Sequence, residues 1–236
     1  MSLATSELER IVQANVPVLC LDTCSLLDVV RDPSRETSLP HDAAAAAALL
    51  QALAVGPNLV SLLAEQVQLE LGGHLADVTA EAERGMRKLR AHVARVDGLV
   101  RAFGGTASTD LSAWDQHLST ASSVAQRWIQ ASTAAPQSPS VPNRAYLRVM
   151  HVRAPARKGK DSLQDCVVLE TYLEAVVELR RNGLAAPVVF LSSNTADYSE
   201  SPTKKSQLHP ELIPEFAALN MQYATGYGMA KALLGL

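Results

Sequence analysis

The chain has 236 residues, of which 47% are hydrophobic, 19% charged and only 4% aromatic, and its formal net charge is −3. This composition is typical of a globular protein and excludes a disordered chain, a collagen-like fibre and a disulfide scaffold. No apolar run approaches the roughly 20 residues that span a bilayer, and the first residues do not resemble a secretory signal. The three cysteines, Cys20, Cys24 and Cys166, lack paired metal spacing, so we expect reduced, mostly buried thiols in a cytoplasmic protein.

Charge is distributed unevenly along the chain. Residues 1–83 have a net charge of −9, residues 84–160 of +10, and residues 161–236 of −4. This asymmetry would suit a protein that gathers carboxylates at one site and presents a cationic surface beside it. Ordinary solvated helix faces would give the same pattern, and charge alone favours that simpler interpretation.

The first predicted strand covers residues 16–22, a short apolar run that begins at a proline boundary and ends in a polar turn. A helical turn is expected at residues 26–30. Residues 42–53 contain six consecutive alanines followed by leucines, which favours a helix. Asp42 is expected to cap the N-terminus of that helix.

A second buried strand is predicted at residues 59–63, after a Gly-Pro-Asn break. Residues 65–71 open another helix, in which the pair Gly72-Gly73 is either an internal weak point or a stop. A charged helical stretch follows at residues 77–103, and residues 111–131 again have helical spacing.

The C-terminal part begins with a proline-rich loop at residues 134–143 and a basic segment at residues 146–160. An amphipathic helix is predicted from residue 165 to residue 179, closed by Asn182-Gly183. Residues 187–191 form a third buried strand. Residues 215–236 are mixed, with a short strand or helix followed by a final helix.

Short apolar strands separated by helices imply a parallel sheet. We therefore expect an α/β protein with three layers (α/β/α) and a central, mainly parallel sheet. The chain is expected to form a single domain, residues 1–236, with a helical and loop insertion at residues 104–157.

Six polar side chains follow the predicted strands or open the next helices: Asp22, Glu70, Asp161, Asp165, Asn194 and Asp197. Ligands of parallel α/β sheets bind beyond the carboxyl ends of the strands, where these side chains would converge. Carboxylates that converge in a low-dielectric cleft repel one another, and a divalent cation removes that conflict. Oxygen ligands suit Mg²⁺ or Mn²⁺ rather than zinc. Such an ion can activate water for displacement at phosphorus, and the basic segment could hold the polyanionic substrate.

In their order along the chain, four motifs resemble those of the PIN domain, a metal-dependent ribonuclease family common in toxin–antitoxin systems. They are residues 18–23 (VLCLDT), 65–71 (EQVQLEL), 158–165 (KGKDSLQD) and 189–198 (VFLSSNTADY). The resemblance covers about residues 16–200. It is closest to a larger PIN-like branch that carries a helical insertion.

The resemblance implies specific roles for residues of this chain. It implies that Mg²⁺ or Mn²⁺ is bound by Asp22, Glu70, Asp165, Asn194 and Asp197. The four carboxylates among these residues are the implied catalytic residues. Supporting hydrogen bonds are implied for Thr23 and Ser192, with Asp161 as a supporting residue or a helix cap. RNA phosphates are expected to contact Arg153, Arg157, Lys158 and Lys160, although a solvated loop is an equal alternative. A metal-activated water would cleave the RNA to leave 5′-phosphate and 3′-hydroxyl ends.

The implied function is a Mg²⁺- or Mn²⁺-dependent endoribonuclease, either a toxin with an antitoxin protein as partner or an RNA-processing enzyme. Family members often form homodimers, and no membrane partner is expected. A non-catalytic module that binds RNA or protein is the alternative, because Asn194 stands where the family often has Asp. An aspartate-nucleophile phosphatase is less favoured, because it requires a second acid where Cys24 stands. Asn194 and Asp197 could also be turn formers, and Glu65 competes with Glu70 for the acidic role.

Overall fold

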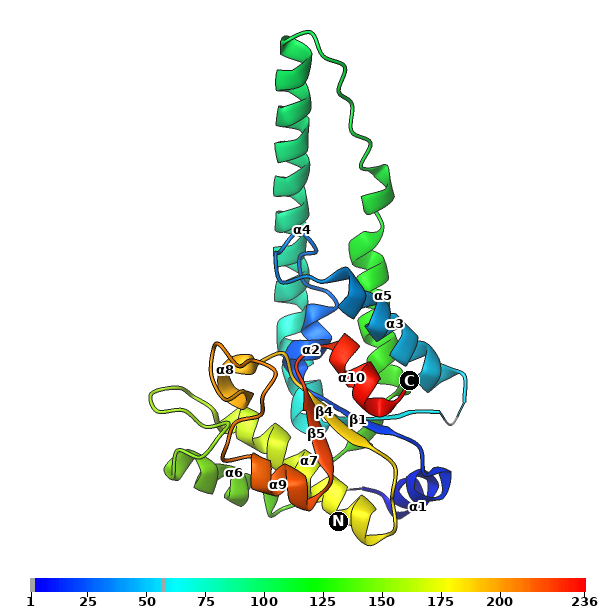
Figure 1. Cartoon of the computed structure of the whole chain (residues 1–236), viewed down its shortest axis with the longest axis vertical. Coiled ribbons are helices and arrows are strands. Elements are labelled where there is room, and N and C mark those ends of the chain that lie inside the picture. Colours follow the sequence, from blue (N-terminus) through cyan, green and yellow to red (C-terminus); the bar gives the residue numbers. More distant parts are fainter. Residues whose placement is uncertain (1–2, 57) are drawn as a thin grey trace.

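The computed structural model describes residues 3–56 and 58–236 (Figure 1). The strands are β1 (Val18–Leu21), β2 (Val60–Ala64), β3 (Thr133–Ala135), β4 (Val188–Leu191) and β5 (Met221–Ala224). The helices before β3 are α1 (Thr5–Ala14), α2 (Thr23–Asp28), α3 (Pro40–Ala54), α4 (Glu65–Ala102), the 3₁₀ turn η1 (Ser112–Trp114) and α5 (His117–Ala131). The helices after β3 are α6 (Val141–Met150), α7 (Leu163–Arg181), α8 (Thr195–Tyr198), α9 (Ile213–Ala218) and α10 (Tyr227–Leu234).

The strands form one parallel sheet in the order β3-β2-β1-β4-β5. The central strands β1, β2 and β4 are buried on both faces, which explains why their sequences are continuous apolar runs rather than alternating ones. Leu21 of β1 pairs with Leu191 of β4, so the residues that follow these strands, Asp22 and Ser192, leave the sheet at the same level. The register therefore brings the ends of distant segments to one edge.

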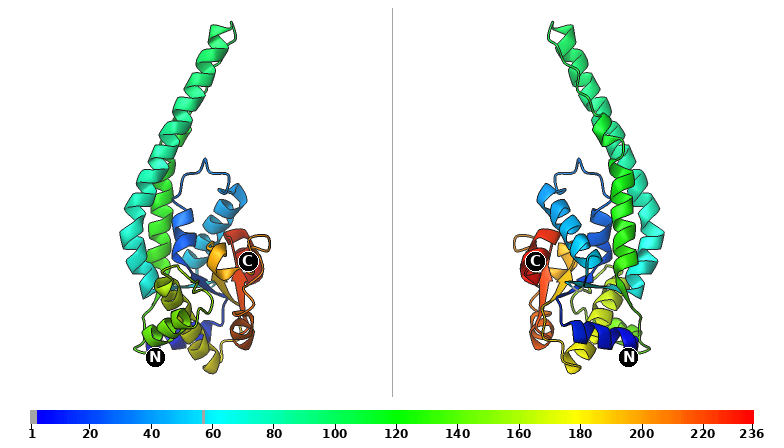
Figure 2. Two further views of the ribbon diagram at one scale, coloured as in Figure 1. Left: turned by 90° about the vertical axis from the view of Figure 1, so that its left-hand side faces the viewer. Right: turned by 90° about the vertical axis from the view of Figure 1, so that its right-hand side faces the viewer.

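Helices cover both faces of the sheet. On one side, α7 packs against β2 and β3 and is covered in turn by α1 and α6. On the other side, α10 packs against β1, β4 and β5, and α3 packs against α10 (Figure 2). The three-layer α/β/α architecture with a parallel sheet, as predicted, is confirmed.

Helix α4 is much longer than the other helices and projects beyond the layered body (Figures 1 and 2). Its 38 residues span about 57 Å at 1.5 Å per residue. Met86 is its last buried apolar residue, and the chain returns to the body through residues 103–116. We call residues 87–116 the arm. Within the described residues, no helix combines the length and the apolar character that a membrane span requires.

Two local predictions are corrected, and one open alternative is decided. Asp42 does not cap α3, which begins at Pro40; its carboxylate instead accepts a hydrogen bond of 2.7 Å from the backbone N–H of Gly228. The pair Gly72-Gly73 does not stop α4, which continues through it. The predicted loop at residues 134–143 contains most of β3, which pairs with β2 as an edge strand, and the start of α6.

Candidate active site at the carboxyl edge of the sheet

Asp22 is buried at the carboxyl edge, with 2% of its surface exposed. It caps the N-terminus of α2, and its carboxylate accepts hydrogen bonds from the Thr23 backbone N–H (2.9 Å) and from the Ser192 hydroxyl (2.6 Å). The pKa of Asp22 is nevertheless raised to about 7, mainly by burial and also by the charges of Asp165 and Glu70, while the two hydrogen bonds oppose this shift. The site therefore disfavours a charge on Asp22.

Glu70 reaches the same edge from the second turn of α4. Its Oε2 accepts a hydrogen bond of 2.5 Å from the Thr23 hydroxyl, which links it to the residue after Asp22. Gln66 donates to its other oxygen at 3.1 Å. Glu65, the alternative acid of this motif, is directed elsewhere, since it accepts a hydrogen bond from the backbone of Gln137. The geometry thus favours Glu70 over Glu65 as the member of the site.

Asp165 and Asp197 are joined by a single cation. The Lys160 ammonium group lies 3.1 Å from Asp165 Oδ2 and makes a second, very short contact with Asp197 Oδ2. Asn194 donates to the same oxygen of Asp197 at 2.6 Å, and Arg157 lies 3.5 Å from its other oxygen. The side chain of Asp197 is completely buried, so these contacts compensate a charge that water does not reach.

Asp165 completes the group of acids that we call the carboxylate cluster: Asp22, Glu70, Asp165 and Asp197. Burial raises the pKa of Asp165, and the charges of Asp197 and Glu70 act in the same direction while Lys160 opposes them. Each acid of the cluster thus lies within electrostatic range of at least one other. These acids come from four separate segments of the chain, and the carboxyl edge of the sheet brings them together.

The supporting residues have different roles. The Ser192 hydroxyl donates to Asp22 and accepts from the Asn194 backbone N–H at 3.2 Å. Thr23 connects Asp22 to Glu70 through its own N–H and hydroxyl. Asp161 is exposed and accepts only a long hydrogen bond, 3.4 Å, from the backbone of Leu163 at the start of α7. It acts at the helix end and not in the cluster.

Two tyrosines that the sequence interpretation overlooked also support this edge. The buried hydroxyl of Tyr172 donates to the carbonyl of Leu21 and accepts from the N–H of Ala64 at 3.0 Å, so it ties the ends of β1 and β2 together. Burial raises the pKa of Tyr172 well above its usual value, which keeps the donor proton in place. Tyr198 donates to the carbonyl of Asp165 at 3.2 Å. The i, i+7 spacing of Asp165 and Tyr172 could have indicated their shared helix face.

The four predicted RNA-binding residues differ in their ion-pair partners. Arg157 and Lys160 face the cluster carboxylates. Arg153 pairs with Glu215 at 2.6 Å, and Lys158 is exposed. Only Lys158 among these four has no ion-pair partner within the described part of the chain.

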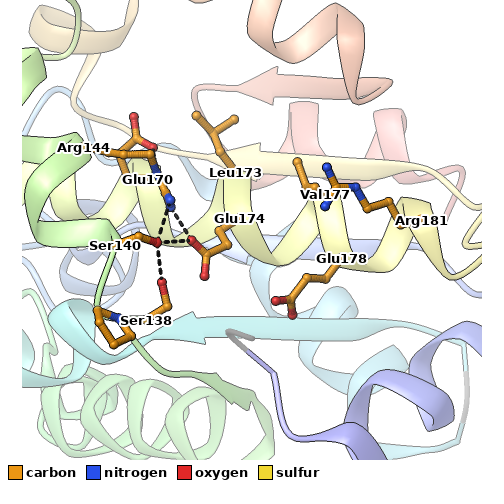
Figure 3. Close-up of a pocket in the computed structure, with 10 residues that line it drawn as sticks. Ser138, Ser140, Arg144, Glu170, Leu173, Glu174, Val177, Glu178 and Arg181 are labelled. Atoms are coloured by element: carbon orange, nitrogen blue, oxygen red, sulfur yellow. Dashed lines mark hydrogen bonds and ion pairs between the residues drawn. The ribbon is translucent and has the colours of Figure 1, made fainter.

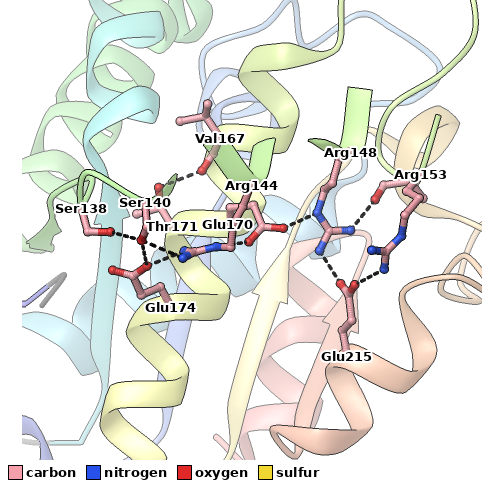
Figure 4. A network of polar contacts seen from close by, with 11 residues as sticks. Ser138, Ser140, Arg144, Arg148, Arg153, Val167, Glu170, Thr171, Glu174 and Glu215 are labelled. Atoms are coloured by element: carbon pink, nitrogen blue, oxygen red, sulfur yellow. Dashed lines mark hydrogen bonds and ion pairs between the residues drawn. The ribbon is translucent and has the colours of Figure 1, made fainter. Parts of the chain in front are cut away.

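The neighbouring Arg148 belongs to a buried ion-pair network (Figure 4). It contacts Glu170 of α7 and Glu215 of α9, while Arg144 bridges Glu170 and Glu174. Removing one partner of such a network leaves an uncompensated buried charge. The network therefore fastens α6 to α7 and α9, and part of the positive charge of the basic segment is used inside the protein.

A polar groove runs along the outer side of α7 (Figure 3). Its lining includes Ser138, Arg144, Glu174, Glu178 and Arg181, and it contains no member of the carboxylate cluster. Arg144 and Glu174 are already paired with each other across it. The groove is thus a separate surface feature.

The thiol of Cys24 lies beside Asp22 and is partly buried. Burial raises the pKa of this thiol to about 12, and the charge of Asp22 adds to the effect. A thiol with that pKa stays protonated at neutral pH and is a poor nucleophile.

The arrangement of the cluster determines whether its oxygen atoms can bind a divalent cation. Within residues 3–56 and 58–236, no three His, Cys, Asp or Glu side chains are arranged so that they could hold a metal ion. The ammonium group of Lys160 instead lies between two of the acids. Within the described residues, the buried Oδ1 of Asp197 has no hydrogen-bond partner, and the Arg157 guanidinium lies 3.5 Å from it, so this oxygen is the kind of group a cation satisfies. The oxygen donors thus fit Mg²⁺ or Mn²⁺ in chemistry, and Lys160 would have to move to admit one.

Comparisons of this chain with models of known protein families, with curated proteins and with solved structures found no match. The resemblance to the PIN domain therefore stays a prediction that rests on the four motifs.

Proposed function

We propose that this protein is a metal-dependent ribonuclease that hydrolyses RNA phosphodiester bonds at the carboxylate cluster. The observation that carries the proposal is the gathering of four acids at the carboxyl edge, where burial and mutual repulsion raise the pKa of Asp22 to about 7. Acids whose pKa is shifted by burial and by neighbouring charges cluster at functional sites. When bound, Mg²⁺ or Mn²⁺ would neutralise the acids, activate water and stabilise the charge that develops at phosphorus.

The roles of the side chains follow from their contacts. Asp22 and Asp165 would hold the cation, with Glu70 and Asp197 as further oxygen donors. Thr23 and Ser192 hold Glu70 and Asp22 in position through hydrogen bonds of 2.5 and 2.6 Å. Lys160 and Arg157 already contact the acids and, once displaced by the cation, would be free to bind the phosphate of the substrate.

A non-catalytic RNA-binding module is the second candidate. Lys160 favours it, because its ammonium group already compensates Asp165 and Asp197 without any metal. In such a protein the cluster would be a structural ion-pair group, and RNA would bind without being cut. A toxin with an antitoxin partner and an RNA-processing enzyme remain two settings for the catalytic proposal.

The decisive experiment compares Asp165→Asn with its matched control, Asp161→Asn. The two acids are four residues apart in the sequence, but only Asp165 belongs to the cluster, whereas Asp161 is exposed and precedes α7. We expect Asp165→Asn to lose Mn²⁺ binding in calorimetry and to reduce Mn²⁺-dependent cleavage of a labelled RNA by 100-fold or more. Asp161→Asn should behave like the wild type.

Either of two results would contradict the ribonuclease proposal. Cleavage that persists in Asp165→Asn would move the chemistry away from the cluster. A wild-type protein that binds RNA in EDTA, but cuts none of it with Mn²⁺ or Mg²⁺, would establish the non-catalytic module instead.

A further inference from the structure

Helix α4 carries a row of basic side chains that the proposed active site does not use. Arg84, Lys88 and Arg95 are exposed, and within the described residues they form no ion pair or hydrogen bond. At 3.6 residues per turn, the three positions fall within about 40° of one another around the helix. We call these three residues the basic stripe.

The other basic residues of the same helix are arranged differently. Arg87 pairs with Glu83, Arg90 pairs with Asp115, and Arg101 donates to the carbonyl of Ala107 at 2.7 Å. Around the helix axis, these three lie about 80–140° from the centre of the stripe. Unpaired positive charge is therefore concentrated on one face of α4, where it has no partner inside the described part of the protein.

The stripe borders a groove between α4 and the loop that follows α2. Lys88, His92 and Arg95 line it from the helix, and Asp32 and Ser34 line it from the loop, around a volume of about 520 Å³. Asp32 is the one acid among these lining residues, and its Oδ1 accepts hydrogen bonds from the backbone N–H and hydroxyl of Ser34 at 2.8 and 2.7 Å. Lys88, His92 and Arg95 thus line a groove whose one carboxylate, that of Asp32, is hydrogen-bonded to Ser34.

Gly85 makes this close approach possible. A Cβ atom at Gly85 would lie 1.8 Å from Asp32 Oδ2, so any side chain there would push the loop residue away. Glycine in a helix interior costs about 1 kcal/mol relative to alanine. Gly85 stands where the loop that carries Asp32 contacts α4, next to Arg84 of the stripe.

The stripe and the carboxylate cluster lie on the same helix. Glu70 is in the second turn of α4, which passes α2 and continues away from the sheet (Figure 1). At 1.5 Å per residue, the stripe begins about 21 Å and ends about 38 Å beyond Glu70. A strand with a helical rise of about 3.4 Å per phosphate covers those distances in roughly 6 to 11 nucleotides.

We propose that the basic stripe of α4 binds the phosphate backbone of RNA, so that the arm holds the substrate several nucleotides away from the bond at the carboxylate cluster. This inference deepens the proposed ribonuclease function, and it rests on that function for the placement of the RNA strand between the stripe and the carboxylate cluster. Charge complementarity carries the choice of partner: the stripe offers three unpaired cations in a row, and a polyanion supplies evenly spaced charges to match.

The test measures binding of a fluorescently labelled, single-stranded 20-nucleotide RNA by anisotropy, in EDTA so that no cleavage occurs. The test variant carries Arg84→Gln, Lys88→Gln and Arg95→Gln. The control variant carries Arg87→Gln, Arg90→Gln and Arg101→Gln, which remove the same charge from the same helix. Circular dichroism checks that both variants fold.

We expect the stripe variant to bind at least tenfold more weakly near 0.1 M salt. Each phosphate contact to a single strand contributes about 0.7 to the slope of log affinity against log salt concentration, so that slope should fall by about 2. The control should keep the wild-type slope. Equal losses in both variants, or no binding by the wild type, would overturn the inference.

Two further outcomes distinguish RNA binding by the stripe from dimerisation through the stripe and from the proposed catalytic site. A dimer of the wild type that the stripe variant loses, with unchanged RNA binding, would assign the stripe to a second copy of the chain and overturn it. Loss of binding in the stripe variant, together with cleavage that persists in Asp165→Asn, would retain the RNA-binding stripe and refute the proposed catalytic site.

Discussion

Asp22 shows how the chemistry of one residue affects the stability of the whole chain. Its pKa is raised from 3.8 to about 7 in the folded protein, first by burial and then by the charges of Asp165 and Glu70. Between these two pH values, the folded protein keeps a proton that the unfolded chain has released. The free energy of unfolding therefore falls as pH rises from about 4 to about 7, and this contribution of Asp22 is lost above pH 7.

Replacing Asp22 with Asn tests this coupling. The amide cannot ionise but can still accept the hydrogen bond of the Thr23 N–H, so the cap of α2 is kept. We expect Asp22→Asn to match the wild type near pH 4 and to be more stable at pH 8, by about 4 kcal/mol at most. Urea denaturation in EDTA at pH 4, 6 and 8 measures the difference. Asp161→Asn is the control, and an identical pH dependence in all three proteins would contradict the expectation.

The residues of the site were predictable from the sequence to the extent that strand ends dictate their position. Asp22 follows an apolar run directly, and Asp197 lies a few residues after another, so a parallel sheet brings both to one edge. The partner of these acids was not predictable. Lys160 lies in a basic segment that suggests RNA contact, and only the folded loop reveals that it bridges Asp165 and Asp197. Pairing between distant side chains leaves no periodic signal.

At the scale of elements, α4 shows that the low helix propensity of glycine does not by itself predict where a helix ends. Two adjacent glycines left open either a weak point within the helix or its end, and the helix continues through them. Contacts on both sides explain this: Val67 and Leu71 are buried before the glycines, and Ala82 and Met86 are buried after them. Packing of the flanking turns thus outweighs the backbone entropy of two residues. The short strand β3 was missed for a related reason, because only its pairing with β2 defines it.

The glycines of α4 offer a matched pair of substitutions. Gly73 is exposed and a Cβ there would meet nothing within 4 Å, so Gly73→Ala should stabilise the protein by about 0.5–1 kcal/mol. Gly85→Ala should gain less or destabilise, because its Cβ would displace the Asp32 carboxylate from its bonds with Ser34. Thermal and urea unfolding measure both. Equal stabilisation by the two variants would show that the Asp32 loop does not constrain α4.

The whole molecule consists of a layered body and an arm with very different amounts of burial. All residues of β1, β2 and β4 are buried, and most of α7 is buried as well. Beyond Met86, the only buried residue of α4 is Asp97, whose carboxylate accepts hydrogen bonds from Thr109. Local unfolding needs least free energy where few apolar contacts are lost. The arm should therefore open independently of the body.

Hydrogen exchange followed by mass spectrometry tests whether the arm unfolds more easily than the body and whether RNA binds along it. Without RNA, we expect amides of residues 90–102 to exchange at least tenfold faster than those of residues 67–86, because these outer turns of α4 bury no apolar side chain. Adding a 20-nucleotide RNA in EDTA should slow exchange along the basic stripe and in the loop around Asp32, since a bound backbone must hold both sides of the groove. The stripe variant should keep the rapid exchange with or without RNA. Uniform protection along the whole of α4 in the free protein would show instead that the arm is as stable as the body, and RNA would then meet a rigid surface.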